Sequence, residues 1–192
     1  MAPKVKVNKQ DIIEAAIELI RKDGASALGS RALAAALGCS TQPIFSNFSC
    51  MEDLESEVIA AAYEKYASYL TAEAASGKHP RYKAFGLAYI RFAREERELF
   101  KLLFMRDRGG DDSLSSPDFD ESVNLIMATN GLSRQSATRM HLEMWALVHG
   151  IASMLATSFF APDDELISRM TSDVYSGLRE KLIKEELGEL KA

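Results

Sequence analysis

The sequence predicts an all-α fold of about nine helices arranged in two parts. Along most of the 192 residues, apolar side chains recur three and four positions apart, which is the spacing of one helix face. No run of alternating β-branched residues is closed by an Asn-Gly or Asp-Gly turn, as a β-hairpin would require. Apolar residues make up 47% of the chain and charged residues 27%, which is typical of a globular protein with its own core.

The first expected helix spans residues 9–23. Asn8 is a suitable N-cap, Asp11 lies in the first turn, and Gly24 follows the last apolar position. The apolar face has helical spacing and comprises Ile12, Ala16, Leu19 and Ile20.

Two short helices are expected next, at 30–37 and 41–47, with a tight turn between them. Gly38 closes the first because glycine tolerates a left-handed backbone, and Ser40 or Thr41 can cap the second. Two short helices joined in this way behind a supporting helix form a helix-turn-helix.

The remainder of the chain predicts longer helices. Ser49 and Glu52 have the spacing of a capping box, which starts a helix over 49–75. Gly and Pro residues separate the later segments, with the longest loop at 107–117. The later helices are expected at 81–95, 97–106, 119–130, 134–160 and 164–187.

Net charge differs between the two parts of the chain. The formal charge is −5, from 23 basic and 28 acidic residues. Residues 1–50 carry six basic and four acidic side chains, a net of +2, whereas residues 51–192 carry 17 and 24, a net of −7. The overall charge alone disfavours nucleic-acid binding, but the asymmetry indicates that the two parts have different partners.

The sequence indicates a cytoplasmic protein without a membrane partner. Cys39 and Cys50 are too few for a disulfide framework, and the N-terminus lacks a secretory signal. The longest uncharged stretch, 145–161, is shorter than a membrane span and predicts a buried helix.

The stretch Ser30 to Phe48 closely resembles the DNA-binding domain of the tetracycline-repressor (TetR) family of transcriptional regulators. The resemblance covers roughly residues 8–60 and rests on an ordered set of apolar, glycine and aromatic positions. It implies a dimeric, all-helical, ligand-responsive regulator, with a DNA-binding domain at 1–50 and a ligand-binding and dimerisation domain at 51–192. A weaker resemblance to the family's C-terminal domain extends from Phe92 to Met105 and over Trp145 to Gly150.

In that family the helix that matches 41–47 lies in the major groove of DNA. By position, the resemblance implies contacts to bases from Thr41, Gln42 and Pro43, and contacts to bases or phosphates from Ser30, Arg31, Phe45, Ser46 and Asn47. The side-chain chemistry is compatible, because Gln pairs with adenine, Arg pairs with guanine, and Pro offers apolar surface to a thymine methyl.

Two positions depart from the family pattern. Phe45 stands where a tyrosine is common, and Met51 where a lysine is common, so a hydroxyl donor and a cation to phosphate are lost. We expect weaker DNA binding with a flatter salt dependence. The lysines of the N-terminal segment, Lys4, Lys6 and Lys9, are candidates to replace these contacts.

Structural roles are the alternatives for several of these residues. Ser30 and Ser40 have the residue type of helix caps, Arg31 that of a solvated surface charge, and Phe45 that of a core aromatic. Phe48 is expected in the core outright.

The second part of the chain has the composition of an apolar effector site. Five of the eight methionines lie between 105 and 154, and methionine adapts to irregular ligands. Ordinary core packing is the alternative for most of these residues, and a satisfied core histidine is the alternative for His149. The candidate effector residues are Phe85, Tyr89, Phe92, Phe104, Met105, Met127, Met144, Trp145 and His149.

A homodimer through the last two helices is expected, as the family resemblance implies. Small residues such as Gly150 and Ala156 permit close helix approach, and the last helix carries an apolar stripe. The stripe consists of Leu166, Met170, Val174, Leu178, Leu182 and Ile183.

An enzyme is disfavoured, and no catalytic residue, metal or cofactor is predicted. The sequence contains no nucleophile elbow, P-loop or zinc-protease motif, and His141 and His149 are not at the metal-binding i, i+4 spacing. The remaining alternative is a helical ligand-binding or interaction protein that has lost specific DNA binding.

Overall fold

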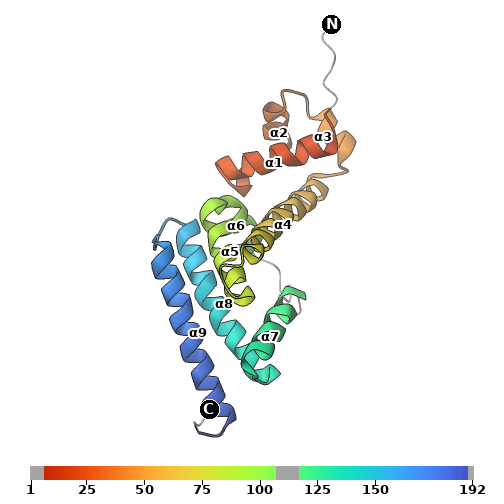
Figure 1. The fold of residues 1–192 in the computed structure, drawn as a ribbon. Coiled ribbons are helices and arrows are strands. Elements are labelled where there is room, and N and C mark those ends of the chain that lie inside the picture. Colours follow the sequence, from red (N-terminus) through yellow and green to blue (C-terminus); the bar gives the residue numbers. More distant parts are fainter. Residues whose placement is uncertain (1–6, 107–116, 190–192) are drawn as a thin grey trace. The chain divides into compact units, whose positions relative to one another are not determined.

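The computed structural model describes residues 7–106 and 117–189, which form nine α-helices and one short 3-10 turn (Figure 1). Within these ranges there is no β-strand, so the predicted all-α class is confirmed. The expected loop at 107–117 lies almost entirely outside the described residues.

The chain divides into two compact units. Unit 1 comprises residues 1–68 and 95–106, and unit 2 comprises residues 69–94 and 107–192. Unit 1 extends beyond residue 50 because helix α6, at Arg97–Phe104, packs against α1, at Lys9–Asp23.

Helix α1 has the predicted boundaries. Asn8 and Asp11 form a reciprocal capping box, in which the Asn8 side chain accepts from the Asp11 N–H at 3.0 Å and the Asp11 carboxylate accepts from the Asn8 N–H at 2.8 Å. The helix ends at Gly24, whose φ of +82° is a conformation that glycine adopts without strain.

Helices α2 (Ser30–Ala36) and α3 (Gln42–Asn47) form the expected helix-turn-helix. The turn follows Gly38, with φ of +64°, and the Cys39 N–H donates to the Ala34 carbonyl at 2.9 Å. The predicted capping of α3 was wrong: Thr41 occupies the N-cap position, but its side chain makes no capping hydrogen bond.

The core of unit 1 is formed by the inner faces of α1 to α4 and α6. Helix α4 spans Met51–Ala75, and its residues up to 68 belong to this unit. The capping box predicted for Ser49 was wrong, because α4 begins at Met51, which leaves Ser49 one residue before the N-cap position. The buried side chains include Ile12, Ala16, Ile20, Leu33, Ile44, Phe48, Leu54, Val58, Leu99, Phe100 and Leu103.

Unit 2 contains α5 (Arg81–Glu95, up to residue 94), α7 (Pro117–Asn130), α8 (Arg134–Ala156) and α9 (Asp164–Glu186). Helix α8 packs against both α7 and α9, and α8 and α9 run side by side (Figure 1). One cluster of buried residues in this unit comprises Val123, Ile126, Leu132, Ala137, Met140 and Leu182.

Helix α8 ends at Ala156, four residues before the predicted end. Ser158 has φ of +57°, and the Phe159 N–H donates to the Met154 carbonyl at 3.0 Å. This is the same helix-ending hydrogen bond as that after Gly38, formed here without a glycine, so the sequence carried no stop signal. Among the described helices, none has the length and apolar character needed to cross a bilayer.

Candidate functional site

Helix α3 presents a polar outer face on an apolar anchor. Ile44 is fully buried and Phe48 is 5% exposed, so the expectation that Phe48 belongs to the core is confirmed. Gln42, Phe45 and the two following polar residues are exposed. The outer face is therefore held by buried neighbours and is accessible to a partner.

The polar groups on this face differ in how far they are already hydrogen-bonded. The Ser46 hydroxyl donates to the Gln42 carbonyl, and the Asn47 amide donates to the Pro43 carbonyl, both at 2.8 Å. These two bonds leave acceptor oxygens on Ser46 and Asn47. The side chains of Gln42 and Thr41 have no hydrogen-bond partner among the described residues.

Phe45 is 50% exposed, which excludes the alternative that it is a core aromatic. An exposed phenyl ring on a short surface helix offers apolar contact but no hydrogen bond. Whether it contacts DNA remains a prediction.

Helix α2 contributes the two remaining candidates. Ser30 is the first residue of α2, where Gly29 holds the N-cap position without a side-chain hydrogen bond, so the capping alternative for Ser30 is excluded. Arg31 is exposed and has no ion-pair partner within the described ranges. Its guanidinium is therefore available to a base or a phosphate.

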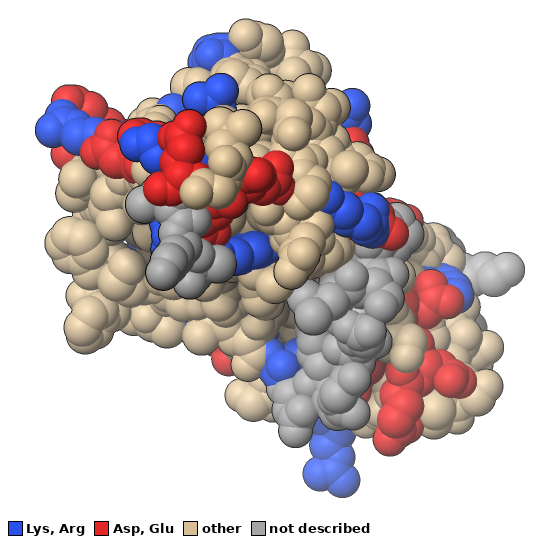
Figure 2. All heavy atoms as spheres, turned by 90° about the horizontal axis from the view of Figure 1, so that it is seen from below, with Lys and Arg blue, Asp and Glu red and all other residues tan. Residues whose placement is uncertain are grey.

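The surroundings of this face are only weakly basic. Lys9 is the first residue of α1, where its ammonium pairs with Glu57 at 2.6 Å and lies 5.5 Å from the Phe48 ring centroid. Lys9 therefore belongs to the folded unit, while Lys4 and Lys6 lie outside the described residues. Figure 2 views the molecule from below the orientation of Figure 1 and shows acidic and basic side chains interspersed on that face as well.

In unit 2, three of the predicted effector residues lie together. The Tyr89 hydroxyl is 2.8 Å from His149 Nδ1, and the Trp145 and His149 ring centroids are 5.6 Å apart. Tyr89 is buried, whereas Trp145 is 45% exposed. These residues combine aromatic surface with a polar pair, which suits an amphipathic ligand.

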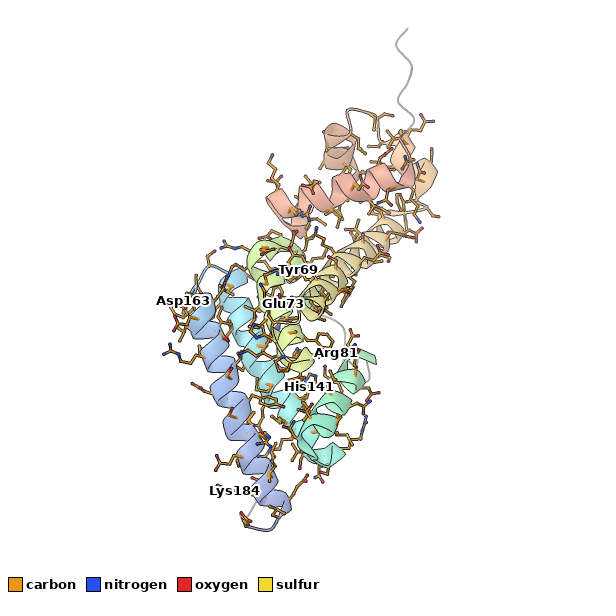
Figure 3. The ribbon with its side chains drawn as sticks, in the orientation of Figure 1. Tyr69, Glu73, Arg81, His141, Asp163 and Lys184 are labelled. Atoms are coloured by element: carbon orange, nitrogen blue, oxygen red, sulfur yellow. The ribbon has the colours of Figure 1, made fainter. Side chains whose placement is uncertain are left out.

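A second Tyr–His pair joins the same two helices, and sequence reasoning missed it. The Tyr82 hydroxyl on α5 lies 3.0 Å from Nδ1 of His141 on α8. His141 is labelled in Figure 3. Burial raises the pKa of Tyr82 and lowers the pKa of His141 from 6.5 to about 4, so both groups are neutral near pH 7. The available signal was the spacing: the tyrosines are seven apart and the histidines eight apart.

The other effector candidates have separate surroundings. Phe92 is fully buried and its ring meets the Tyr69 ring at 5.3 Å, while Met144 is 5% exposed. The Phe85 ring centroid lies 5.4 Å from the guanidinium carbon of Arg81. Met127 packs against the buried cluster of unit 2 that contains Val123 and Met140.

Phe104 and Met105 belong to unit 1. The Phe104 ring packs edge-on against Tyr66, with 5.2 Å between ring centroids, and Met105 is 43% exposed.

A hollow of about 560 Å³ lies along the C-terminal half of α9 and contains none of the predicted effector residues. It is lined by Tyr175, Ser176, Arg179, Glu180, Ile183, Lys184, Leu187 and Glu189. Within the described ranges, no three His, Cys, Asp or Glu side chains lie close enough to hold a metal ion.

The predicted apolar stripe on α9 divides between two environments. Leu182 belongs to the buried cluster of unit 2, and Leu178 and Ile183 pack against that cluster, so these three residues face their own chain. Leu166 and Val174 remain 39% and 37% exposed. Leu166 and Val174, with half-buried Met170, therefore leave apolar surface for another molecule.

The family model for the C-terminal domain of tetracycline-repressor-like proteins matches residues 82–174. The matched region runs from α5 into the first half of α9 and lies outside the helix-turn-helix residues 30–48. This match and the helix-turn-helix fold support membership of the TetR family. The same match supports a role as a transcriptional regulator.

Solved structures with the same fold include TetR-family proteins. A protein of unknown function from Rhodococcus sp. RHA1 is 22% identical, with a TM-score of 0.73 over 93% of this chain and 100% of that one. A TetR-family member from Streptomyces coelicolor A3 is 18% identical, with a TM-score of 0.60 over 86% and 96%.

A TetR variant from Acinetobacter baumannii AYE, solved in complex with minocycline, is also 18% identical, with a TM-score of 0.54 over 94% and 97%. No curated protein sequence matches the chain. At these identities the structural likeness concerns the fold.

Proposed function

We propose that the protein is a ligand-responsive DNA-binding regulator that acts in the cytoplasm and is released from a near-palindromic operator by a small apolar or amphipathic effector. The observation that carries the proposal is the outer face of α3. Gln42 there is exposed without an internal partner, on a helix anchored by fully buried Ile44. An exposed amide on an anchored recognition helix suits base-edge contact in the major groove.

The proposed contacts extend on both sides of Gln42. Thr41 and Pro43 meet base edges or a thymine methyl, and Arg31, with no internal partner, meets a guanine or a phosphate. Ser30, Phe45, Ser46 and Asn47 complete the contact surface.

The decisive experiment selects duplexes from a random-sequence pool with the purified protein and titrates the enriched duplex against salt. We expect a sequence with twofold symmetry and half-sites about 34–36 Å apart, roughly one turn of DNA. Because Met51 supplies no cation and Lys9 is paired with Glu57, the salt dependence should be shallow. A pool from which no sequence is enriched would support the alternative, a helical binding protein that has lost DNA recognition.

A homodimer is the second part of the proposal. Trp145 on α8 and Leu166 and Val174 on α9 leave apolar side chains exposed on two adjacent helices. A second copy would cover such surface and pair two recognition helices.

Sedimentation analysis at micromolar concentration tests the dimer. Val174→Glu should yield monomers, whereas Ser176→Glu, placed about 200° around the same helix, should not. A monomeric wild-type protein would contradict this part of the proposal.

The effector is proposed to bind beside Tyr89, Trp145 and His149. This group combines a half-exposed indole with a hydrogen-bonded Tyr–His pair. The structural neighbour solved in complex with minocycline supports a small-molecule site in this fold. Native mass spectrometry of the purified protein tests this idea: a co-purifying small molecule should be retained by the wild type and lost from Trp145→Ala.

The proposed mechanism is a population shift. The effector binds one conformer more tightly, and DNA binds the other more tightly, so each weakens the affinity of the other by the same factor. Titrations that show no mutual effect would exclude this mechanism for the ligand tested.

A further inference from the structure

An ion pair with two parallel hydrogen bonds joins two distant segments of unit 1. Arg21, in the last turn of α1, donates from Nε to one Glu96 oxygen at 2.8 Å and from Nη2 to the other at 2.7 Å. The residues are 75 positions apart in sequence, so the pair fixes tertiary rather than local structure. A planar guanidinium facing a carboxylate in this way sets orientation as well as distance.

The pair is shielded more than the other ion pair that reaches α1 from a distance. The Glu96 side chain is 11% exposed and that of Arg21 is 30% exposed. In the Lys9–Glu57 pair both side chains are nearly half exposed, and one contact joins them. Shielding and two-point contact make the Arg21–Glu96 pair the stronger constraint on α1.

The neighbouring contacts tighten the same junction. Gly24, three residues after Arg21, lies so close to Glu98 that a Cβ there would be 3.3 Å from a carboxylate oxygen. Leu99, in the first turn of α6, is fully buried. The end of α1 and the start of α6 therefore pack as one structure.

Each partner is connected to a functional part of the chain. Arg21 follows the fully buried Ile20 on α1, and α1 packs against both α2 and α3. Glu96 is the next residue after α5, which carries Tyr89 and ends at Glu95. A displacement of the end of α5 therefore reaches Glu96 through the covalent chain.

We propose that the Arg21–Glu96 pair is a positioning contact that holds α1, and through it the recognition helix α3, in the orientation that reads DNA. The inference rests on the proposed function and names the contact through which helix α5 controls DNA binding. A change at α5 that displaces Glu96 loosens α1 and lowers specific affinity while general attraction to phosphate remains.

The test compares Glu96→Gln, Arg21→Lys and the double variant with Glu57→Gln. Glu57→Gln is a matched control because it also removes one negative charge from an ion pair on α1 in the same unit. The probes are the duplex enriched by the wild type and a scrambled duplex of the same length.

We expect Glu96→Gln to lower affinity for the enriched duplex about tenfold, as loss of a charge-assisted hydrogen bond does, with the scrambled duplex unaffected. The double variant should be no worse than either single one if the two groups act as a unit. Glu57→Gln should keep the ratio of specific to non-specific affinity. Equal ratios for Glu96→Gln and Glu57→Gln would overturn the proposal.

Hydrogen exchange separates this inference from the proposed function. If the wild type enriches no duplex, the proposed function fails, and the positioning role is then decided by amide protection in α3. Glu96→Gln should reduce that protection relative to Glu57→Gln. Unchanged protection would overturn the positioning role.

Discussion

Polar side chains on the recognition helix α3 and polar side chains between helices α5 and α8 differ in their hydrogen bonding. On α3, Gln42 points to solvent with no internal partner, and Ser46 bonds only to its own helix. Between α5 and α8, the Tyr82 and Tyr89 hydroxyls each meet a histidine from the other helix. The first arrangement leaves hydrogen-bonding capacity for a partner, and the second uses it to fix two helices together.

The largest expected effect is a difference in stability between substitutions at a buried and at an exposed residue of α3. Ile44→Ala should lower the free energy of unfolding by about 2–5 kcal/mol, because Ile44 is fully buried and its truncation leaves a cavity. Phe45→Ala, one residue along and half exposed, should leave stability nearly unchanged and reduce DNA affinity instead. Chemical denaturation of both variants measures the difference, and equal stability losses would show that Phe45 also has a core role.

The second prediction concerns base reading. Gln42→Ala should cost about 1–3 kcal/mol of discrimination at one base pair of the enriched duplex, since one side chain reads one base edge. Binding to a panel of single-base variants measures this discrimination. A uniform loss over all sequences would assign Gln42 to the DNA backbone.

The third prediction tests the contact between α5 and α8 through pH. The pKa of His141 is lowered to about 4, so between pH 6.5 and 4 the unfolded chain binds a proton that the folded chain resists. Stability is therefore full above pH 6.5 and falls as the pH drops toward 4, by about 1–2 kcal/mol after allowing for partial solvent screening. Urea denaturation at pH 7 and 4.5 should show a smaller fall for His141→Asn than for the wild type. An equal fall would mean that carboxylates account for the whole effect.

The smallest effect is expected at an exposed pair in unit 1. Glu57→Gln removes the Lys9–Glu57 ion pair, and because both side chains are nearly half exposed the loss of stability should be below about 1 kcal/mol. Thermal unfolding measures it. A larger loss would show that Glu57 also holds the Lys9 ammonium in place above the Phe48 ring.

The same contrast explains which parts of the fold could be predicted from sequence. The boundaries of α1 follow from Asn8 and Gly24, and the turn after α2 follows from Gly38, because each signal lies within a few residues of the structure it specifies. The predicted end of α8 was wrong because Ser158 adopts a left-handed conformation there, where the sequence has no glycine to signal it.

In the candidate site, too, local features could be predicted from the sequence and contacts between distant residues could not. The exposure of Gln42 and the burial of Ile44 are one-helix properties that periodicity predicts. The Tyr82–His141 hydrogen bond joins residues 59 positions apart, and nothing local marks it. Its partner pair, Tyr89–His149, was anticipated only as a set of residue types suited to a ligand.

The two Tyr–His pairs restrict insertions and deletions within helix α8. They join α5 and α8 at two heights, seven residues apart on one helix and eight on the other. Inserting or deleting a single residue between His141 and His149 would rotate one histidine by about 100° around the helix relative to the other. Substitutions in this stretch can be absorbed one side chain at a time, but a one-residue change in length would leave a buried tyrosine or histidine without its partner.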